Sequence, residues 1–196
     1  VISSIRAVDN AILVVDANAG VEVGTERAWQ LMEEAGLPRL IFVNKSDKEG
    51  VNRDKVVSEI KEALSKNAVV LNSSALEELM EPIAESDDAL LEKYLAEGKL
   101  TLEEISGGLH NAVSQAKVFP IIFGSALNNS GIDDLLKAIK EYLASPEENP
   151  HLEIQEGEVT PAESAPFSAF VFKSIFDPYV GQLSLVRIFS GKLTAN

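Results

Sequence analysis

The sequence has no cysteine, only two histidines and no long run of apolar residues. Without cysteine the chain has no disulfide, no thiolate metal ligand and no cysteine nucleophile, which fits a cytoplasmic protein. His110 and His151 are far apart, so neither a metal cluster nor a Ser–His–Asp triad is indicated, and His110 is expected on a helix surface. No segment is apolar enough to span a membrane. We therefore predict no catalytic residue, no metal site and no membrane contact.

Basic residues are scarce: 17 lysines and arginines stand against 31 aspartates and glutamates, giving a formal net charge of −14 at pH 7. Contacts to nucleic-acid phosphates come mainly from lysine and arginine. We therefore expect no direct nucleic-acid binding by this acidic chain. Excess negative charge also keeps a protein in solution without implying any partner, and that is the simpler explanation.

The tetrapeptide Asn44-Lys45-Ser46-Asp47 follows the apolar run 40–43, which is typical of a buried strand. An N-K-x-D sequence in this position is typical of the loop that reads guanine in GTP-binding proteins. The carboxylate of Asp47 only accepts hydrogen bonds, so it suits the N1–H and N2–H donors of guanine. Asn44 can donate to N7 or O6, and the Lys45 stem can lie against the base. These residue types are also common in surface turns, so this motif alone leaves that alternative open.

A second motif favours the guanine-reading interpretation. The apolar run 118–123 predicts another buried strand, which ends in Gly124 and an S-A-L sequence. GTP-binding proteins carry such a loop here, and its backbone N–H groups add contacts to guanine O6. Small residues let the backbone approach the base, and an amphipathic helix is expected from Ile132 onward. The two motifs together predict that guanine is bound by Asn44, Lys45, Asp47, Ser125, Ala126 and Leu127.

The phosphate-binding half of such a domain is missing from the sequence. No G-x-x-x-x-G-K-[ST] loop occurs in it, and no D-x-x-G precedes the predicted strand 11–16. Phosphate binding and hydrolysis depend on those elements. We therefore expect the C-terminal part of a GTP-binding domain, which neither hydrolyses GTP nor holds GTP or GDP tightly. A sheet without its first strands would also have an exposed edge and reduced stability.

Hydrophobic periodicity predicts an α/β fold with a parallel sheet. Beside the strands already named, a helix is expected at 23–35, with Trp29 packing it against the sheet. Capping boxes are indicated at Ser74–Glu77 and Thr101–Glu104. The predicted organisation is a partial P-loop-type G domain at 1–47 and 119–146, a peripheral helical insertion at 48–118, a linker at 147–165 and the start of a β-barrel domain at 166–196.

Several segments resemble bacterial elongation factor G. In the first part of the chain these are the stretches 8–11, 20–21, 42–45, 90–95, 100–104 and 118–131, with Ser145-Pro146 at the end. In the C-terminal part the stretches 166–173, 177–181 and 190–191 resemble the start of that family's second domain. The resemblance covers nearly the whole chain, and the Asp177-Pro178-Tyr179-Val180-Gly181 turn is fairly specific to the family.

The resemblance implies part of a translational GTPase that binds guanine nucleotide, with Mg²⁺ in the complete protein, and acts on the ribosome during translocation. Ser46 stands where the family usually has methionine or leucine, so a paralogue is expected. The insertion between the guanine loop and the S-A-L loop is shorter than is usual in the family. The alternative is a GTPase-derived module of the ribosome-protection or recycling type. Such a module would contact the ribosome or a protein without turning over nucleotide in this chain.

Overall fold

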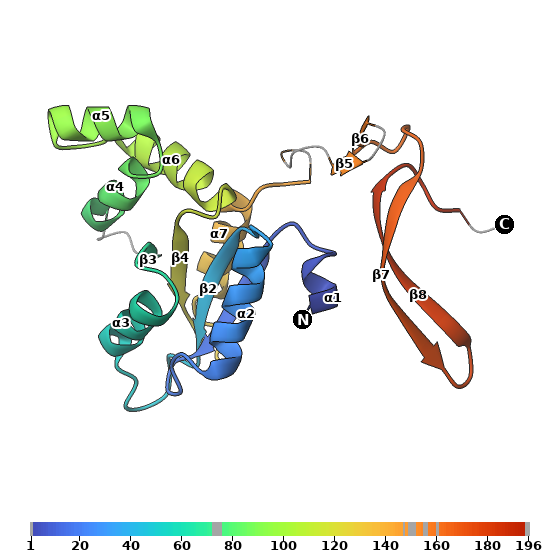
Figure 1. The fold of residues 1–196 in the computed structure, drawn as a ribbon. Helices are drawn as coiled ribbons and strands as arrows, with labels where there is room; N and C mark the ends of the chain where they lie inside the picture. Colours follow the sequence, from blue (N-terminus) through green and yellow to red (C-terminus); the bar gives the residue numbers. More distant parts are fainter. Residues whose placement is uncertain are drawn as a thin grey trace. The chain divides into compact units, whose positions relative to one another are not determined.

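The computed structural model describes residues 2–71, 76–146, 148, 152–154, 157–159 and 161–194. They belong to two compact units, residues 10–143 and residues 1–9 with 144–196. The larger unit is a mixed α/β domain, and the smaller unit is mostly β (Figure 1). Ser74, the first residue of one predicted capping box, and His151 lie outside the described residues.

The larger unit is built on a parallel sheet with the strand order β1-β2-β4-β3. Its strands are β1 (Ala11–Asp16), β2 (Arg39–Asn44), β3 (Ala68–Val70) and β4 (Phe119–Phe123). Residues 40–43 of β2 are at most 4% exposed, as expected for an inner strand that is covered on both faces. The predicted α/β fold with a parallel sheet is confirmed.

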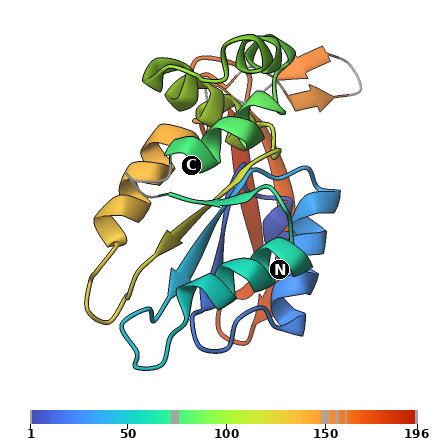
Figure 2. The same ribbon diagram turned by 90° about the vertical axis from the view of Figure 1, so that its left-hand side faces the viewer.

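Helices cover both faces of this sheet (Figures 1 and 2). α2 (Val23–Glu34) and α3 (Arg53–Ala63) lie on one face, and α7 (Ile132–Tyr142) lies on the other. α4 (Leu76–Ala84), α5 (Asp88–Glu97) and α6 (Leu102–Ser114) gather near one end of the sheet. Among the helices of the described chain, none combines the length and apolar character needed to cross a bilayer.

α6 begins with the capping box that the sequence predicts. Thr101 Oγ1 accepts a hydrogen bond from Glu104 N at 3.3 Å, and Glu104 Oε2 accepts one from Thr101 N at 2.9 Å. Lys93 of α5 also donates to Glu104, at 2.6 Å. The Lys93 ammonium and the Thr101 amide together lower the pKa of Glu104 to about 2. The box therefore fixes the start of α6, and the Lys93–Glu104 bond joins α6 to α5.

Two expectations need correction. Residues 48–118 are mostly helical, as expected, but Ala68–Val70 forms the edge strand β3 beside β4. They are not all peripheral, because α6 shares a buried cluster with the sheet. A three-residue apolar run is too short for periodicity to separate strand from helix. The predicted linker 147–165 contains the antiparallel pair β5 (Leu152–Ile154) and β6 (Gly157–Val159). The domain boundaries themselves stay a prediction.

The smaller unit contains α1 (Ile2–Ile5) and a long antiparallel hairpin of β7 (Ser168–Asp177) and β8 (Gly181–Ser190). Its turn is closed by Asp177, whose Oδ1 accepts hydrogen bonds from Tyr179 N at 2.8 Å and Val180 N at 3.0 Å. Gly181 follows with a φ of 85°, a conformation that favours glycine. The predicted C-terminal hairpin is confirmed, and a complete β-barrel stays an expectation.

Trp29 of α2 is buried against the sheet, as expected. Its ring meets the Phe119 ring edge-on, with 4.7 Å between the centroids. The Arg39 guanidinium lies 3.8 Å from the centroid of the Trp29 ring and donates to Leu37 O at 2.9 Å. Burial lowers the pKa of Arg39 to about 10, because the charged form loses hydration. Aromatic and cation–π contacts thus hold α2 to the amino ends of β2 and β4.

Candidate functional site

The two predicted guanine-binding loops follow neighbouring strands of the sheet. β2 pairs with β4 in a parallel register that sets Val43 beside Phe123. Because both strands run in the same direction, the loops 44–48 and 124–131 leave the sheet at the same edge. This edge is where ligands bind in open α/β sheets. The six predicted residues Asn44, Lys45, Asp47, Ser125, Ala126 and Leu127 all lie on these two loops.

The Asn44 side chain connects the two loops. Its Oδ1 accepts hydrogen bonds from Ala126 N at 2.9 Å and from Lys45 N at 2.8 Å. A backbone bond from Ser46 N to Gly124 O, 3.0 Å long, adds a second connection. Lys45 has a φ of 63°, which is uncommon outside glycine. The Asn44 oxygen is committed to the protein, so its Nδ2 group is the donor that it can offer to a base.

The loop 124–131 has a tightly fixed shape. Ser125 N donates to Ser130 O at 2.9 Å, and Ser130 N donates to Ser125 O at 3.1 Å. Ser125 is 1% exposed. A Cβ added at Gly124 would lie 2.5 Å from Ser130 O and 2.7 Å from the Phe42 ring. The packing therefore explains why glycine occupies position 124.

The backbone donors of the S-A-L residues are not equivalent. The N–H groups of Ser125 and Ala126 already donate to protein oxygens. Within the described residues Leu127 N–H has no such acceptor, and the Leu127 side chain is 89% exposed. Of the three groups, Leu127 N–H is thus the donor available to a base oxygen in this conformation.

Asp47 presents an exposed carboxylate beside the S-A-L loop. Its Oδ2 accepts a hydrogen bond from Asn128 Nδ2 at 3.0 Å. Sequence reasoning missed Asn128, because asparagine is common in turns and one that follows the motif therefore gives no special signal. The contact joins residues of different loops and became visible only with the fold.

Asp16, at the end of β1, was also missed, and it pairs with Lys45. Lys45 Nζ donates to Asp16 Oδ2 at 2.5 Å, and Asp16 Oδ1 accepts from Asn18 N at 2.9 Å. Lys45 and the Asn18 amide lower the pKa of Asp16 to about 2, and the carboxylate raises the pKa of Lys45. The strand register sets Asp16 beside Asn44. The polar residue that ends β1, like the one that ends β2, was the sequence signal for Asp16.

The Asp16–Lys45 pair is expected to make stability depend on pH in the acid range. The pKa of Asp16 falls on folding from its ordinary value of 3.8 to about 2, so its contribution is present above pH 4 and is lost as the pH drops toward 2. Asp16→Asn should therefore destabilise the protein at neutral pH and have little effect near pH 2. Urea unfolding of both proteins across this range measures the difference.

Glu104→Gln offers a comparison, because the pKa of Glu104 is also about 2 and this residue caps α6, outside the two loops. Glu104→Gln should likewise destabilise the protein at neutral pH and have little effect near pH 2. If the difference in unfolding free energy between wild type and Asp16→Asn stays constant from pH 6 down to pH 2, the Asp16–Lys45 pair does not form in solution.

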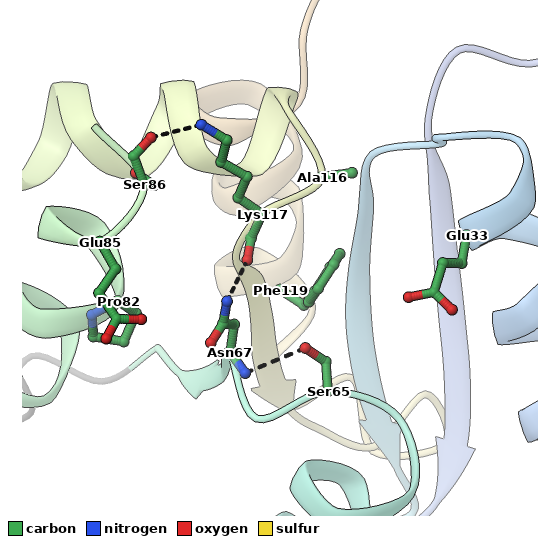
Figure 3. A pocket seen from close by; sticks show the side chains of 9 residues that line it. All are labelled: Glu33, Ser65, Asn67, Pro82, Glu85, Ser86, Ala116, Lys117 and Phe119. Carbon is green, nitrogen blue, oxygen red and sulfur yellow. Dashed lines mark hydrogen bonds between the residues drawn. The ribbon is translucent and has the colours of Figure 1, made fainter. Parts of the chain in front are cut away.

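A separate cavity of about 300 Å³ lies near the amino ends of β3 and β4 (Figure 3). Four of its polar residues bind one another: Lys117 Nζ donates to Ser86 O at 2.6 Å, and Asn67 Nδ2 donates to Lys117 O at 3.1 Å. Asn67 N also donates to Ser65 Oγ at 3.2 Å. These bonds connect the turn after α4 with the loops before β3 and β4. None of the predicted guanine-binding residues lines this cavity.

Comparisons with known proteins agree with the geometry. Residues 1–145 match the family model of the elongation factor Tu GTP binding domain. A crystal structure of a protein from Thermus thermophilus is similar over 98% of this chain, with 28% sequence identity and a TM-score of 0.77. The present chain spans 33% of the length of that protein. The chain therefore belongs to the family of the elongation factor Tu GTP-binding domain, and so to the translational GTPases.

Proposed function

We propose that this chain is the guanine-reading part of a translational GTPase of the elongation factor G type. It would bind the base of GTP and GDP at the two loops that carry Asn44, Lys45, Asp47, Ser125, Ala126 and Leu127, where Leu127 N–H is the backbone donor left for a base oxygen. The complete protein would hydrolyse GTP in the cytoplasm and act on the ribosome during translocation. These residues would supply nucleotide recognition and no catalytic group.

The pairing of the two loops carries this proposal. Asn44 ties the N-K-x-D loop to Ala126, and the Asp47 carboxylate lies exposed beside the S-A-L loop. A carboxylate matches the two adjacent donors of guanine, N1–H and N2–H, and Asn44 Nδ2 matches an acceptor. Adenine has no N2 amine, so it would leave Asp47 without its partners, and that loss provides discrimination.

The phosphates and Mg²⁺ are proposed to be bound by other parts of the complete protein. Magnesium in such enzymes is held by oxygen ligands together with the nucleotide phosphates. Among the described residues no group of three or more histidine and acidic side chains is placed to hold a metal ion. The role proposed for the described residues is therefore recognition of the base.

The elongation factor G assignment is supported by the C-terminal hairpin. Its turn contains the Asp177–Gly181 sequence that resembles this family, and Asp177 closes it through Tyr179 N and Val180 N. We propose the domain boundaries given by the sequence, with a β-barrel domain beginning at residue 166. Ser46 supports a paralogue within the family.

We expect this chain alone to bind guanine weakly and selectively. Base contacts without phosphate contacts should give a dissociation constant weaker than about 1 mM, or only ~4 kcal/mol. In a folded sample, millimolar guanosine should shift the NMR signals of the amides at 44–47 and 125–127, and adenosine should not. Calorimetry should detect no micromolar binding of GTP and no turnover.

Equal shifts with both nucleosides would argue against guanine recognition and favour the interaction module. Micromolar GTP binding would show that phosphates are held by residues of this chain after all.

A further inference from the structure

Asn128 contacts the carboxylate that is proposed to read guanine, although it belongs to neither the N-K-x-D nor the S-A-L sequence. Its Nδ2 donates to Asp47 Oδ2 at 3.0 Å. Both side chains are exposed and sit on different loops. An exposed carboxylate with no partner exchanges between rotamers. The contact therefore restricts the orientation of Asp47 before any base arrives.

Asn128 can do this because its own backbone is fixed. Its N–H donates to Ser125 Oγ at 3.3 Å, and the buried Ser125 pairs with Ser130 in both directions. The next residue, Asn129, has a φ of 54°, and Gly131 has a φ of 69°. The loop thus follows a tight path that keeps the Asn128 side chain facing Asp47.

The contact leaves room for the base. An ionised carboxylate has two oxygens with about four acceptor positions, and Asn128 uses one of them on Oδ2. Oδ1 and the second position on Oδ2 stay available for the N1–H and N2–H donors. An amide also keeps its donor character at every pH, so the orientation does not depend on a titrating group.

We propose that Asn128 is a positioning residue for guanine recognition, which holds the Asp47 carboxylate in the orientation that accepts from N1–H and N2–H. This inference rests on the proposed guanine-binding function. It adds a specificity-determining residue that neither motif contains.

The test uses the complete protein. It measures dissociation constants for GDP and for inosine diphosphate, whose base lacks the N2 amine. Asn128→Ala should weaken GDP binding about two- to tenfold, because the base must then order the Asp47 side chain that Asn128 held in place beforehand. Inosine diphosphate has one donor fewer for Asp47, so it should lose less, and the preference for GDP should shrink. Asn128→Asp should reduce the preference further, because it sets a second carboxylate beside Asp47.

Asn129→Asp is the matched control, because it adds the same charge one residue away at a φ that aspartate tolerates. It should leave the preference for GDP unchanged. A double-mutant cycle separates positioning from general loop damage. Once Asp47→Ala has removed the carboxylate, Asn128→Ala should have no further effect on GDP affinity.

Three results would overturn the inference. The first is that the effects of Asn128→Ala and Asp47→Ala on GDP affinity add independently. The second is that Asn129→Asp reproduces the effect of Asn128→Asp, and the third is tighter GDP binding by Asn128→Ala, which would show that Asn128 competes with the base. A wild-type protein that does not prefer GDP over ADP would instead refute the proposed function itself, before any variant is compared.

Discussion

Asp47→Asn is expected to change the nucleotide preference of the complete protein from GTP to xanthosine triphosphate. The substitution places an NH₂ group where an acceptor was, so it would face the N2 amine of guanine and leave both donors unpaired. Loss of a charge-assisted contact and an unpaired group should cost about 2–4 kcal/mol of GTP affinity, or roughly 30- to 700-fold. Xanthine has an oxygen in place of the N2 amine, so it accepts from the new NH₂ group.

Competition between the two nucleotides for wild type and variant measures this change. Asp133→Asn is a suitable control, because the substitution removes the same charge and Asp133 lies in the first turn of α7, outside both loops. It should keep the preference for GTP. If Asp47→Asn also keeps that preference, Asp47 is a turn residue and the guanine-reading interpretation of 44–47 fails.

The second large effect is expected at Gly131, the residue that closes the S-A-L loop. A Cβ there would lie 2.2 Å from Phe123 O and 2.9 Å from Gly124 Cα, both of which are backbone atoms that cannot rotate away. The left-handed conformation costs alanine about 1–2 kcal/mol, and overpacking adds about 1–3 kcal/mol. Gly131→Ala should thus lower the free energy of unfolding by roughly 2–5 kcal/mol.

Gly98 provides a matched comparison. Its φ of 70° is nearly that of Gly131, but a Cβ would meet nothing within 4 Å. Gly98→Ala should therefore cost only the conformational part, about 1–2 kcal/mol. Urea midpoints of the two variants separate these contributions. Equal losses would mean that the loop relaxes around the added methyl group, so that its shape is not fixed by packing.

Local patterns in the sequence predicted the strands and the loops that follow them. The runs 40–43 and 118–123 are apolar because both faces of an inner parallel strand are buried, and the N-K-x-D and S-A-L loops begin where those runs end. The strand β3 gave no such signal, because three residues carry too little periodicity. The β5–β6 pair was hidden in a polar stretch that has the composition of a linker.

The side-chain contacts of the site depended on tertiary structure. Asp16 meets Lys45 only because β1 and β2 are aligned in register. Asn128 meets Asp47 only because β2 and β4 are neighbours and the loop 124–131 follows one path. Neither contact joins residues close in sequence, so composition and spacing could not show it.

Trp29, which packs against Arg39 and Phe119, is the single tryptophan of the sequence. It belongs to the larger unit, whereas Tyr179 at the turn of the β7–β8 hairpin is 97% exposed in the smaller one. Fluorescence excited at the red edge of the tryptophan band therefore follows the unfolding of residues 10–143 alone. Circular dichroism responds to both units, so the two signals together separate the melting of the GTP-binding part from that of the hairpin.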